Sequence, residues 1–427
     1  MDVNNLYLLI NVLLYLTAFI IYQIKQQYFS VGSMFLLFYL SVALVGWHVF
    51  NSPESQGMYL DFKLFPFVYL CVMLLLTTWP ILKFDDRQTV VQRPTNKVFV
   101  FLCSITIIVS VLQIYTVFST FNEGLIAMLA DTDQGAELYR ESMKNNEDSG
   151  VGISNIASII NGAFSNLSVL FLFYSFTLPK RNKYLITGLI IAVVINVMGG
   201  VSSGQRTDVV LKCLTILFTY FLMRNFMHST VRKYVRMAMV VILICIAVPV
   251  LLITIGRFSS TNKVDDHTFY SLEWYYGQSF LFFNNYGLDA DGIRYGDRTA
   301  NLFKQIIWDD TPHNYMERRD KYPHLKIDDY YFYTFIGDFT IDYGPIVGTL
   351  ILVFFSFWFV WGTREREGEL LFHQLILLFF VVCVCAQGTT YLFSFSDVSG
   401  GINLITFLLT YCYFKLDYLV QNKLITF

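Results

Sequence analysis

The chain has 427 residues, of which 55% are hydrophobic, 18% aromatic and only 15% charged, and its formal net charge is −2. Soluble proteins carry about 25% charged residues, and a soluble chain of this length would form two or three domains around separate cores. The near-zero net charge gives no indication of nucleic-acid binding. Because the apolar residues come in runs of about 20, the length that crosses a bilayer, we predict an all-α integral membrane protein with a single polytopic domain over residues 1–427.

Eleven apolar runs of suitable length predict about eleven transmembrane helices. The first run lacks the basic leading residues and the cleavage site of a signal peptide, so we expect it to be a membrane helix. Prolines, glycines and clusters of charge separate the runs. The predicted spans are Asn5–Ile24, Ser30–Phe50, Leu64–Leu82, Lys97–Phe118, Ile153–Leu178, Tyr184–Val201, Val209–Phe226, Arg236–Gly256, Tyr333–Trp361, Leu370–Ala386 and Gly401–Leu419.

Lysine and arginine are concentrated in every second loop, and this bias orients a membrane protein. One set of loops contains the basic segments 83–97, 180–183 and 224–236, whereas the other short loops are poor in cations. The basic set is therefore expected to be cytoplasmic. This places the N-terminus outside and the C-terminus inside.

Two long segments fall on the outer side by this count. Residues 119–152 are rather acidic, and their apolar residues between Phe121 and Leu129 recur at helical spacing, which predicts a short helix on the membrane surface. Residues 257–332 form the largest non-spanning part and are rich in aromatic and polar side chains. Loops of this length usually carry function or are disordered, and abundant aromatics argue against disorder.

The short outer connection before the seventh span combines glycines with cations. Residues 199–208 read Gly-Gly-Val-Ser-Ser-Gly-Gln-Arg-Thr-Asp, so Arg206 lies among residues that let a ligand approach the backbone closely. Lys212 follows one turn inside the helix, where a cation is costly and indicates function. A snorkelling Lys212 paired with Asp208 explains that residue equally well.

Arg257 ends the eighth span on the same predicted face as Arg206. An ordinary interfacial anchor is a sufficient explanation for a single arginine at this place. Two arginines at one depth could also clamp a diphosphate, because the guanidinium fork matches phosphate oxygens.

The long outer loop contains Thr-Pro-His-Asn-Tyr at 311–315. Histidine is the side chain most easily poised for proton transfer near neutral pH, which makes His313 a candidate general base. A lone loop histidine is more often merely solvated, and His267 and His324 are rivals in the same loop.

Two carboxylates begin the ninth span. Asp338 and Asp342 are four residues apart and so share a helix face, and Tyr333 lies just before them. Carboxylates beside tyrosine rings would suit a sugar, whose hydroxyls donate hydrogen bonds and whose faces stack on aromatic rings. Equally, the two acids could cap or brace the start of the helix, where they favour its dipole.

These motifs resemble those of the Wzy-type O-antigen or oligosaccharide repeat-unit polymerases, which are GT-C-like enzymes of the bacterial inner membrane related to the O-antigen ligases. The resemblance covers the topology of the whole chain and three short motifs. They are Gly-Gln-Arg-Thr at 204–207, His-Asn-Tyr at 313–315, and the segment from Phe-Ile-Gly-Asp-Phe to Asp-Tyr-Gly at 335–344.

The resemblance implies a glycosyltransferase that needs no cofactor or metal and polymerises repeat units at the periplasmic face. Donor and acceptor would both be oligosaccharides on undecaprenyl diphosphate, and membrane lipid and a chain-length regulator would be further partners. Arg206 and Arg257 would stabilise the departing diphosphate, and His313 would deprotonate the acceptor hydroxyl. Substrate-binding residues by the same resemblance would be Lys212, Tyr315, Tyr333, Asp338 and Asp342.

Two other functions stay open. A ligase that transfers finished glycan belongs to the same reaction class, although Met-Glu-Arg-Arg at 316–319 stands where a ligase is expected to continue with apolar residues. A flippase for lipid-linked oligosaccharide would need charged residues at mid-membrane depth, and Lys212 is the deepest such residue.

Overall fold

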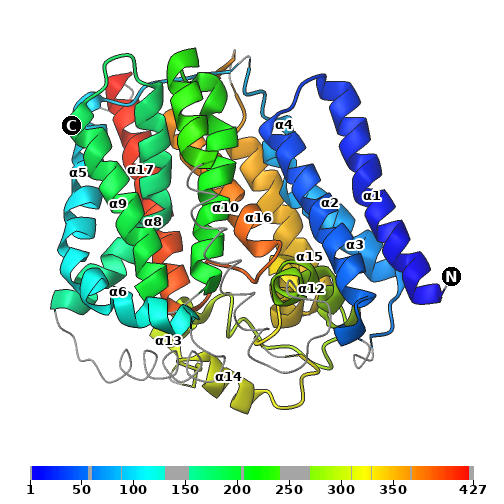
Figure 1. Cartoon of the computed structure of the whole chain (residues 1–427). Helices are drawn as coiled ribbons and strands as arrows, with labels where there is room; N and C mark the ends of the chain where they lie inside the picture. The colour runs from blue at the N-terminus through cyan, green and yellow to red at the C-terminus, as the bar shows by residue number, and fades with distance from the viewer. Residues whose placement is uncertain are drawn as a thin grey trace. The chain divides into compact units, whose positions relative to one another are not determined.

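The computed structural model describes residues 2–55, 60–87, 89–129, 153–202, 206–240, 270–308, 310–327, 329–365 and 368–422. Helices dominate these ranges (Figure 1). Within them, seven helices are long and apolar enough to cross a membrane, which confirms the prediction of an all-α, multi-pass membrane protein. These helices are Val3–Gln26, Val31–Phe50, Asn96–Phe121, Ser158–Thr177, Lys183–Ser202, Thr207–Phe226 and Thr334–Gly362.

The chain divides into two compact units. Unit 1 comprises Met1–Val90 and Tyr270–Ile405, and unit 2 comprises Val91–Phe269 and Thr406–Phe427. Helix α17 (Asp397–Gln421) begins in the first and ends in the second. The remaining elements of unit 1 are α1 (Val3–Gln26), α2 (Val31–Phe50), η1 (Pro53–Ser55), α3 (Leu64–Thr77), α4 (Trp79–Lys83), α12 (Tyr270–Phe282), η3 (Phe283–Gly287), α13 (Asn301–Ile307), α14 (Tyr315–Lys321), α15 (Thr334–Gly362), β2 (Glu369–Leu370) and α16 (Phe372–Gly388).

Unit 2 is a bundle built around α9 (Lys183–Ser202), which contacts each of its four neighbouring helices (Figure 1). The helix predicted between Phe121 and Leu129 is present, as part of α6. The rest of the predicted outer segment 119–152, which is residues 130–152, lies outside the described residues. The neighbours of α9 are α5 (Asn96–Leu112), α6 (Ile114–Leu129), α8 (Ile153–Thr177) and α10 (Arg206–Met223), and η2 (Arg224–Phe226) follows α10; β1 (Val90–Val91) precedes α5.

One predicted span of unit 1 is less regular than expected. The run from Leu64 to Leu82 is divided at Thr78 into α3 and the short helix α4, which has Pro80 in its first turn. Proline tolerates this position because the first turn of a helix has no partner for its missing N–H. Helix α16 has 17 residues, the same length as the predicted run Leu370–Ala386, and begins two residues later.

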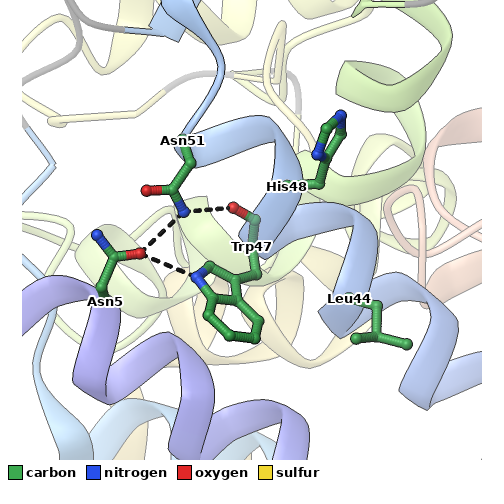
Figure 2. Close-up of a pocket in the computed structure, with 5 residues that line it drawn as sticks. All are labelled: Asn5, Leu44, Trp47, His48 and Asn51. Carbon is green, nitrogen blue, oxygen red and sulfur yellow. Dashed lines mark hydrogen bonds between the residues drawn. The ribbon is translucent and has the colours of Figure 1, made fainter. Parts of the chain in front are cut away.

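Helices α1 and α2 form a hairpin with hydrogen bonds between them at both ends, and Ser33 Oγ donates to Gln23 Oε1 at 2.9 Å across the turn. At the turn, Ser30 and Ser33 cap α2 reciprocally: the Ser33 N–H donates to Ser30 Oγ at 3.2 Å, and the Ser30 N–H donates to Ser33 Oγ at 3.1 Å. At the open end, Asn5 Oδ1 accepts hydrogen bonds from Trp47 Nε1 at 2.9 Å and Asn51 Nδ2 at 2.8 Å (Figure 2). In lipid these internal bonds replace the water that side-chain polar groups would otherwise bind.

Helix α12 is an element that the sequence did not predict, since residues 257–332 were expected to form one loop. It packs along α2, and the two backbones meet where Gly46 and Gly277 face each other. A Cβ atom at Gly277 would lie 2.7 Å from the backbone nitrogen of Gly46, closer than real Cβ atoms approach. Small residues of this kind allow close helix crossings in membrane proteins.

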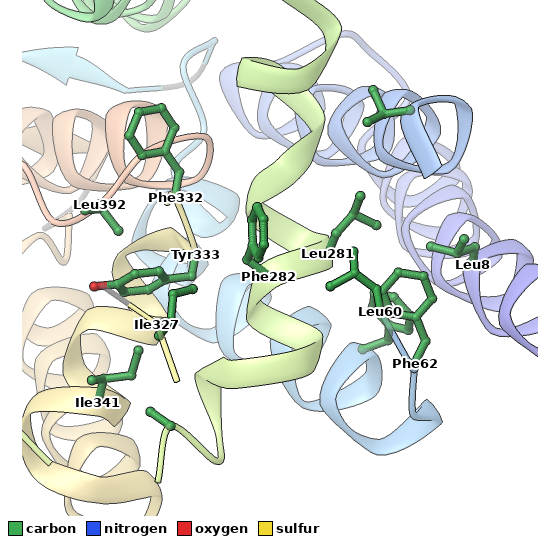
Figure 3. Close-up of a cluster of buried hydrophobic side chains, with 13 residues drawn as sticks. Leu8, Leu60, Phe62, Leu281, Phe282, Ile327, Phe332, Tyr333, Ile341 and Leu392 are labelled. Carbon is green, nitrogen blue, oxygen red and sulfur yellow. The ribbon is translucent and has the colours of Figure 1, made fainter. Parts of the chain in front are cut away.

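The core of unit 1 brings together residues that are far apart in the sequence. Leu8 of α1, Leu281 of α12 and Ile341 of α15 belong to one buried apolar cluster. Figure 3 shows α12 running through the middle of this cluster, with Tyr333 and Ile341 on one side of it and Leu60 and Leu8 on the other. The loop after α12 is therefore packed against the helical part of the unit.

The Gly46–Gly277 crossing can be tested by adding a single methyl group. Gly277→Ala should destabilise the protein by about 1–3 kcal/mol, because overpacking forces backbone shifts. Gly162→Ala in α8 is the matched control, since a Cβ there meets nothing within 4 Å. Thermal unfolding in detergent measures both. Equal unfolding temperatures for the two variants would show that the helices do not cross at these glycines.

Candidate functional site

Unit 1 contains a buried network of arginines and aspartates, here called the Arg–Asp cluster. Its members come from the loop after α12, from α14, from the start of α15 and from the start of α17. Three guanidinium groups face four carboxylates. The members are Arg294, Arg298, Arg318, Asp329, Asp338, Asp342 and Asp397.

Arg294 occupies the centre of the Arg–Asp cluster and contacts three carboxylates. Its Nη2 lies 3.0 Å from Asp338 Oδ1, its Nε lies 2.7 Å from Asp342 Oδ1, and its Nη1 pairs with Asp329. Nη1 also donates to the Tyr333 hydroxyl at 3.0 Å. All these side chains are at least 95% buried, so each charge depends on the others for solvation.

A break in α15 frees a backbone carbonyl that binds the backbone N–H of Arg294. Pro345 has no N–H, so it leaves the carbonyl of Ile341 without its helical partner. The Arg294 N–H donates to that carbonyl at 3.0 Å. Gly344 provides the sharp turn before the proline, with φ 79° and ψ 158°, a conformation that L side chains rarely adopt. The loop therefore attaches at the kink through its backbone as well as its side chain.

The two carboxylates of α15 have no exposed surface and use their oxygens within the protein. Asp338 Oδ1 also lies 3.0 Å from Arg298 Nε, and its Oδ2 accepts from the Phe393 N–H at 2.6 Å. Asp342 Oδ2 accepts from both the N–H and the hydroxyl of Thr299 at 2.7 Å. Both residues thus brace the loop against α15.

Arg318 ties α14 into the same cluster. Its Nε lies 2.5 Å from Asp329 Oδ2, and its Nη1 lies 2.7 Å from Asp397 Oδ1. Burial by itself would raise the pKa of Asp329, but the guanidiniums of Arg298, Arg294 and Arg318 hold that pKa well below its ordinary value. Asp329 is therefore ionised and joins all three arginines.

A second ionic group extends this arrangement to α13. Asp297 pairs with Lys304, and its Oδ2 lies 2.9 Å from Lys321 Nζ and accepts from the Tyr322 hydroxyl at 2.7 Å. Burial opposes ionisation of Asp297, but these three donors lower its pKa below the ordinary value. Helices α13 and α14 are thereby linked to each other.

The segment 313–315 forms the beginning of α14. Asn314 Oδ1 accepts from the Glu317 N–H at 3.0 Å, and the His313 N–H donates to Glu317 Oε2 at 2.8 Å, which is a helix-capping arrangement. The His313 side chain is exposed and Tyr315 is half-buried. Because Arg318 follows one turn later, the Arg–Asp cluster determines where His313 is held.

The residues predicted to form the site are divided between the two units. His313, Tyr315, Tyr333, Asp338 and Asp342 lie in unit 1, and the Arg–Asp cluster brings the last three together. In this structure Tyr333 and the two aspartates are fully buried, so they brace the loop instead of presenting polar groups to a sugar.

The predicted cations of unit 2 are only partly described. Lys212 lies within the span Thr207–Phe226, and its Nζ donates to Asn166 Oδ1 at 3.2 Å. Arg206 is the first residue of α10, but its side chain and the whole of Arg257 lie outside the described residues.

Sequence reasoning missed Arg294, Arg298, Arg318 and Asp329. The sequence did contain one indication of the cluster: Arg294 and Arg298 are four residues apart, as are Asp338 and Asp342. Arg318 belongs to the segment 316–319, which looked like a departure from a ligase, and Asp329 stands in a tyrosine-rich stretch without a recognisable motif.

A groove beside the α1–α2 hairpin is another place where a ligand could bind. It has a volume of about 500 Å³ and is lined by Asn5, Leu44, Trp47, His48 and Asn51. Figure 2 shows that Asn5, Trp47 and Asn51 bond to one another across it. The amide groups of the groove thus hold the hairpin together. The Arg–Asp cluster contains the larger number of charged side chains.

No protein-family model, no curated protein and no solved structure matches this chain. Across the described ranges, no group of three or more His, Cys, Asp or Glu side chains could hold a metal ion. Each carboxylate of the Arg–Asp cluster is paired with at least one arginine.

Removing one carboxylate tests the Arg–Asp cluster. Asp329→Asn should cost about 3–5 kcal/mol of stability, because it leaves buried guanidiniums without their shared counter-charge. Asp310→Asn is the control: its side chain is 80% exposed and only 3.4 Å from Lys321 Nζ, and exposed pairs contribute at most about 1 kcal/mol. Unfolding in detergent measures both, and a cost for Asp329→Asn no larger than for the control would contradict the assignment.

Proposed function

We propose that this protein is a membrane glycosyltransferase that polymerises undecaprenyl-diphosphate-linked oligosaccharide repeat units at the periplasmic face of a bacterial inner membrane. The observation that carries the proposal is the arrangement around α14. An exposed histidine, His313, directly precedes the N-cap of a short helix that Arg318 anchors in a buried ionic network. Anchoring of α14 in this way holds His313 in a fixed position. A fixed position suits a general base, whose efficiency depends on accurate placement.

The roles of the site residues follow from this proposal. His313 takes the proton from the attacking hydroxyl of the acceptor, and the leaving group is the donor's undecaprenyl diphosphate. Arg206 and Arg257 stabilise the charge that develops on that diphosphate, and Lys212 lies deeper on the same helix as Arg206. Tyr315 is placed beside His313 to contact sugar. Asp338, Asp342 and Tyr333 act by positioning the loop.

We also propose eleven spans and a GT-C-like architecture, with the N-terminus periplasmic and the C-terminus cytoplasmic. Seven helices reach spanning length within the described residues. The other four spans would be α3 with α4, the run 236–256, α16 and α17. Alternating loops rich in cations support this orientation.

One contact inside unit 2 favours a flippase as an alternative from another class of function. Lys212 donates to Asn166 within the membrane-spanning part of the bundle. Transporters place such polar pairs along the substrate path. A ligase has no comparable observation in its favour.

Deletion of the gene separates these functions in one experiment. Loss of a polymerase leaves surface lipid that carries single repeat units, as seen by gel electrophoresis of surface glycan. Loss of a ligase strands long polymer on undecaprenyl diphosphate, and loss of a flippase strands single units that face the cytoplasm. An unchanged glycan profile would overturn the proposal.

Complementation of the deletion strain then tests the named residues. His313→Ala, Arg206→Ala and Arg257→Ala should each abolish chain growth while the protein still inserts in the membrane. His324→Ala is the matched control, because it removes another exposed histidine of the same loop. Normal polymer from His313→Ala would remove its role as the base.

A further inference from the structure

The short helix α13 presents its apolar side chains outward. Ile306 and Ile307 are 74% and 65% exposed, and the neighbouring Phe303 and Trp308 are also exposed. We refer to these four residues as the α13 patch. Exposed single apolar residues are ordinary in proteins, but a contiguous group marks an interaction surface.

The inner face of α13 is polar, which reverses the usual pattern of a helix on a water-soluble surface. Asn301 is buried and donates through Nδ2 to the carbonyl of Asp297 at 2.9 Å and to that of Pro312 at 2.8 Å. Gln305 Nε2 donates to Asn301 Oδ1 and to Pro312 O, both at 3.0 Å. A helix that satisfies its polar groups inside and exposes apolar ones is suited to an apolar medium.

The Arg–Asp cluster determines how far α13 lies from the lipid-facing surface of α15. Arg298, three residues before α13 begins, binds Asp338 on the second turn of α15. The exposed apolar surface of α15 starts at Ile346, about two helical turns further along the helix. The α13 patch is therefore tied close to the level at which α15 enters the hydrocarbon region.

The composition of the patch also matches a bilayer interface. Tryptophan is enriched where the ring can lie among headgroups, and lysine stems extend along apolar surface toward water. Lys304 Nζ lies 6.0 Å from the centre of the Trp308 ring and pairs with Asp297 on the inner side. Figure 1 draws α13 and α14 together at the bottom of the view, beyond the long helices of their unit.

We propose that α13 is an interfacial helix, and that Phe303, Ile306, Ile307 and Trp308 insert into the outer leaflet of the membrane. The occupant of the α13 patch is thus phospholipid. The insertion holds the loop that carries His313 against the bilayer surface. The contacts that carry the inference all lie in unit 1. The choice of the outer leaflet rests on the proposed orientation of the chain, and neither depends on the glycosyltransferase activity.

Site-specific photo-crosslinking tests the insertion. The full chain, with p-benzoylphenylalanine placed at Ile306, is reconstituted in nanodiscs of phosphatidylethanolamine and phosphatidylglycerol, irradiated and analysed by intact mass. Phe354, on the exposed apolar face of α15, is the positive control position, and the exposed Asp289 is the negative one. A lipid adduct at Ile306 should approach the yield at Phe354 and exceed that at Asp289 by about tenfold, as expected for a side chain in the interface.

Each other outcome overturns the proposal. An adduct with a second copy of the chain would make the α13 patch an oligomer interface, and an adduct with another peptide of the same chain would show that the protein itself covers it. A yield no greater than at Asp289 would place the patch in water. Normal gel-filtration behaviour of each labelled protein before reconstitution excludes misfolding as the cause.

Discussion

An arginine inside a protein keeps its charge, because its pKa stays far above neutral in any environment. The segment between α12 and α15 contains three buried arginines: Arg294, Arg298 and Arg318. When this segment folds, each of them therefore requires a carboxylate at hydrogen-bonding distance. Asp338 and Asp342 on α15 and Asp329 in the loop meet that requirement. The need to neutralise buried charge determines the path of the loop more than any apolar contact does. Replacing such a network with apolar residues can be neutral in other proteins, whereas removing one partner and leaving a buried charge unpaired is costly.

The fold class and much of the helix pattern could be predicted from the sequence, because apolar runs and their length report directly on the bilayer. Helix α12 could not, since it is rich in tyrosine and its stability comes from the close approach of Gly277 to Gly46 on α2, a contact between residues far apart in the chain. The division of the run Leu64–Leu82 at Thr78 was not predicted, because the prediction followed hydropathy, although Pro80 marks a helix break in the sequence.

The candidate site could likewise be predicted only in part from the sequence. The four-residue spacing of Asp338 and Asp342 predicted that they act together, and both meet Arg294. Their burial could not be foreseen, because it depends on a loop whose arginines lie about 40 residues earlier in the chain. His313 was singled out by its side-chain chemistry, whereas the structure adds the reason for its position, which is the anchoring of α14 by Arg318.

The central claim is that the bonds from α15 hold the whole loop, and hydrogen–deuterium exchange tests it most directly. The comparison is between Asp338→Asn and Asp397→Asn, since the Asp397 side chain is 40% exposed and contacts the cluster from its edge. For Asp338→Asn we predict faster exchange throughout 294–322, with α1 and α2 unchanged. Faster exchange confined to the residues around the substituted position, with 294–322 as protected as in the unaltered protein, would contradict the account.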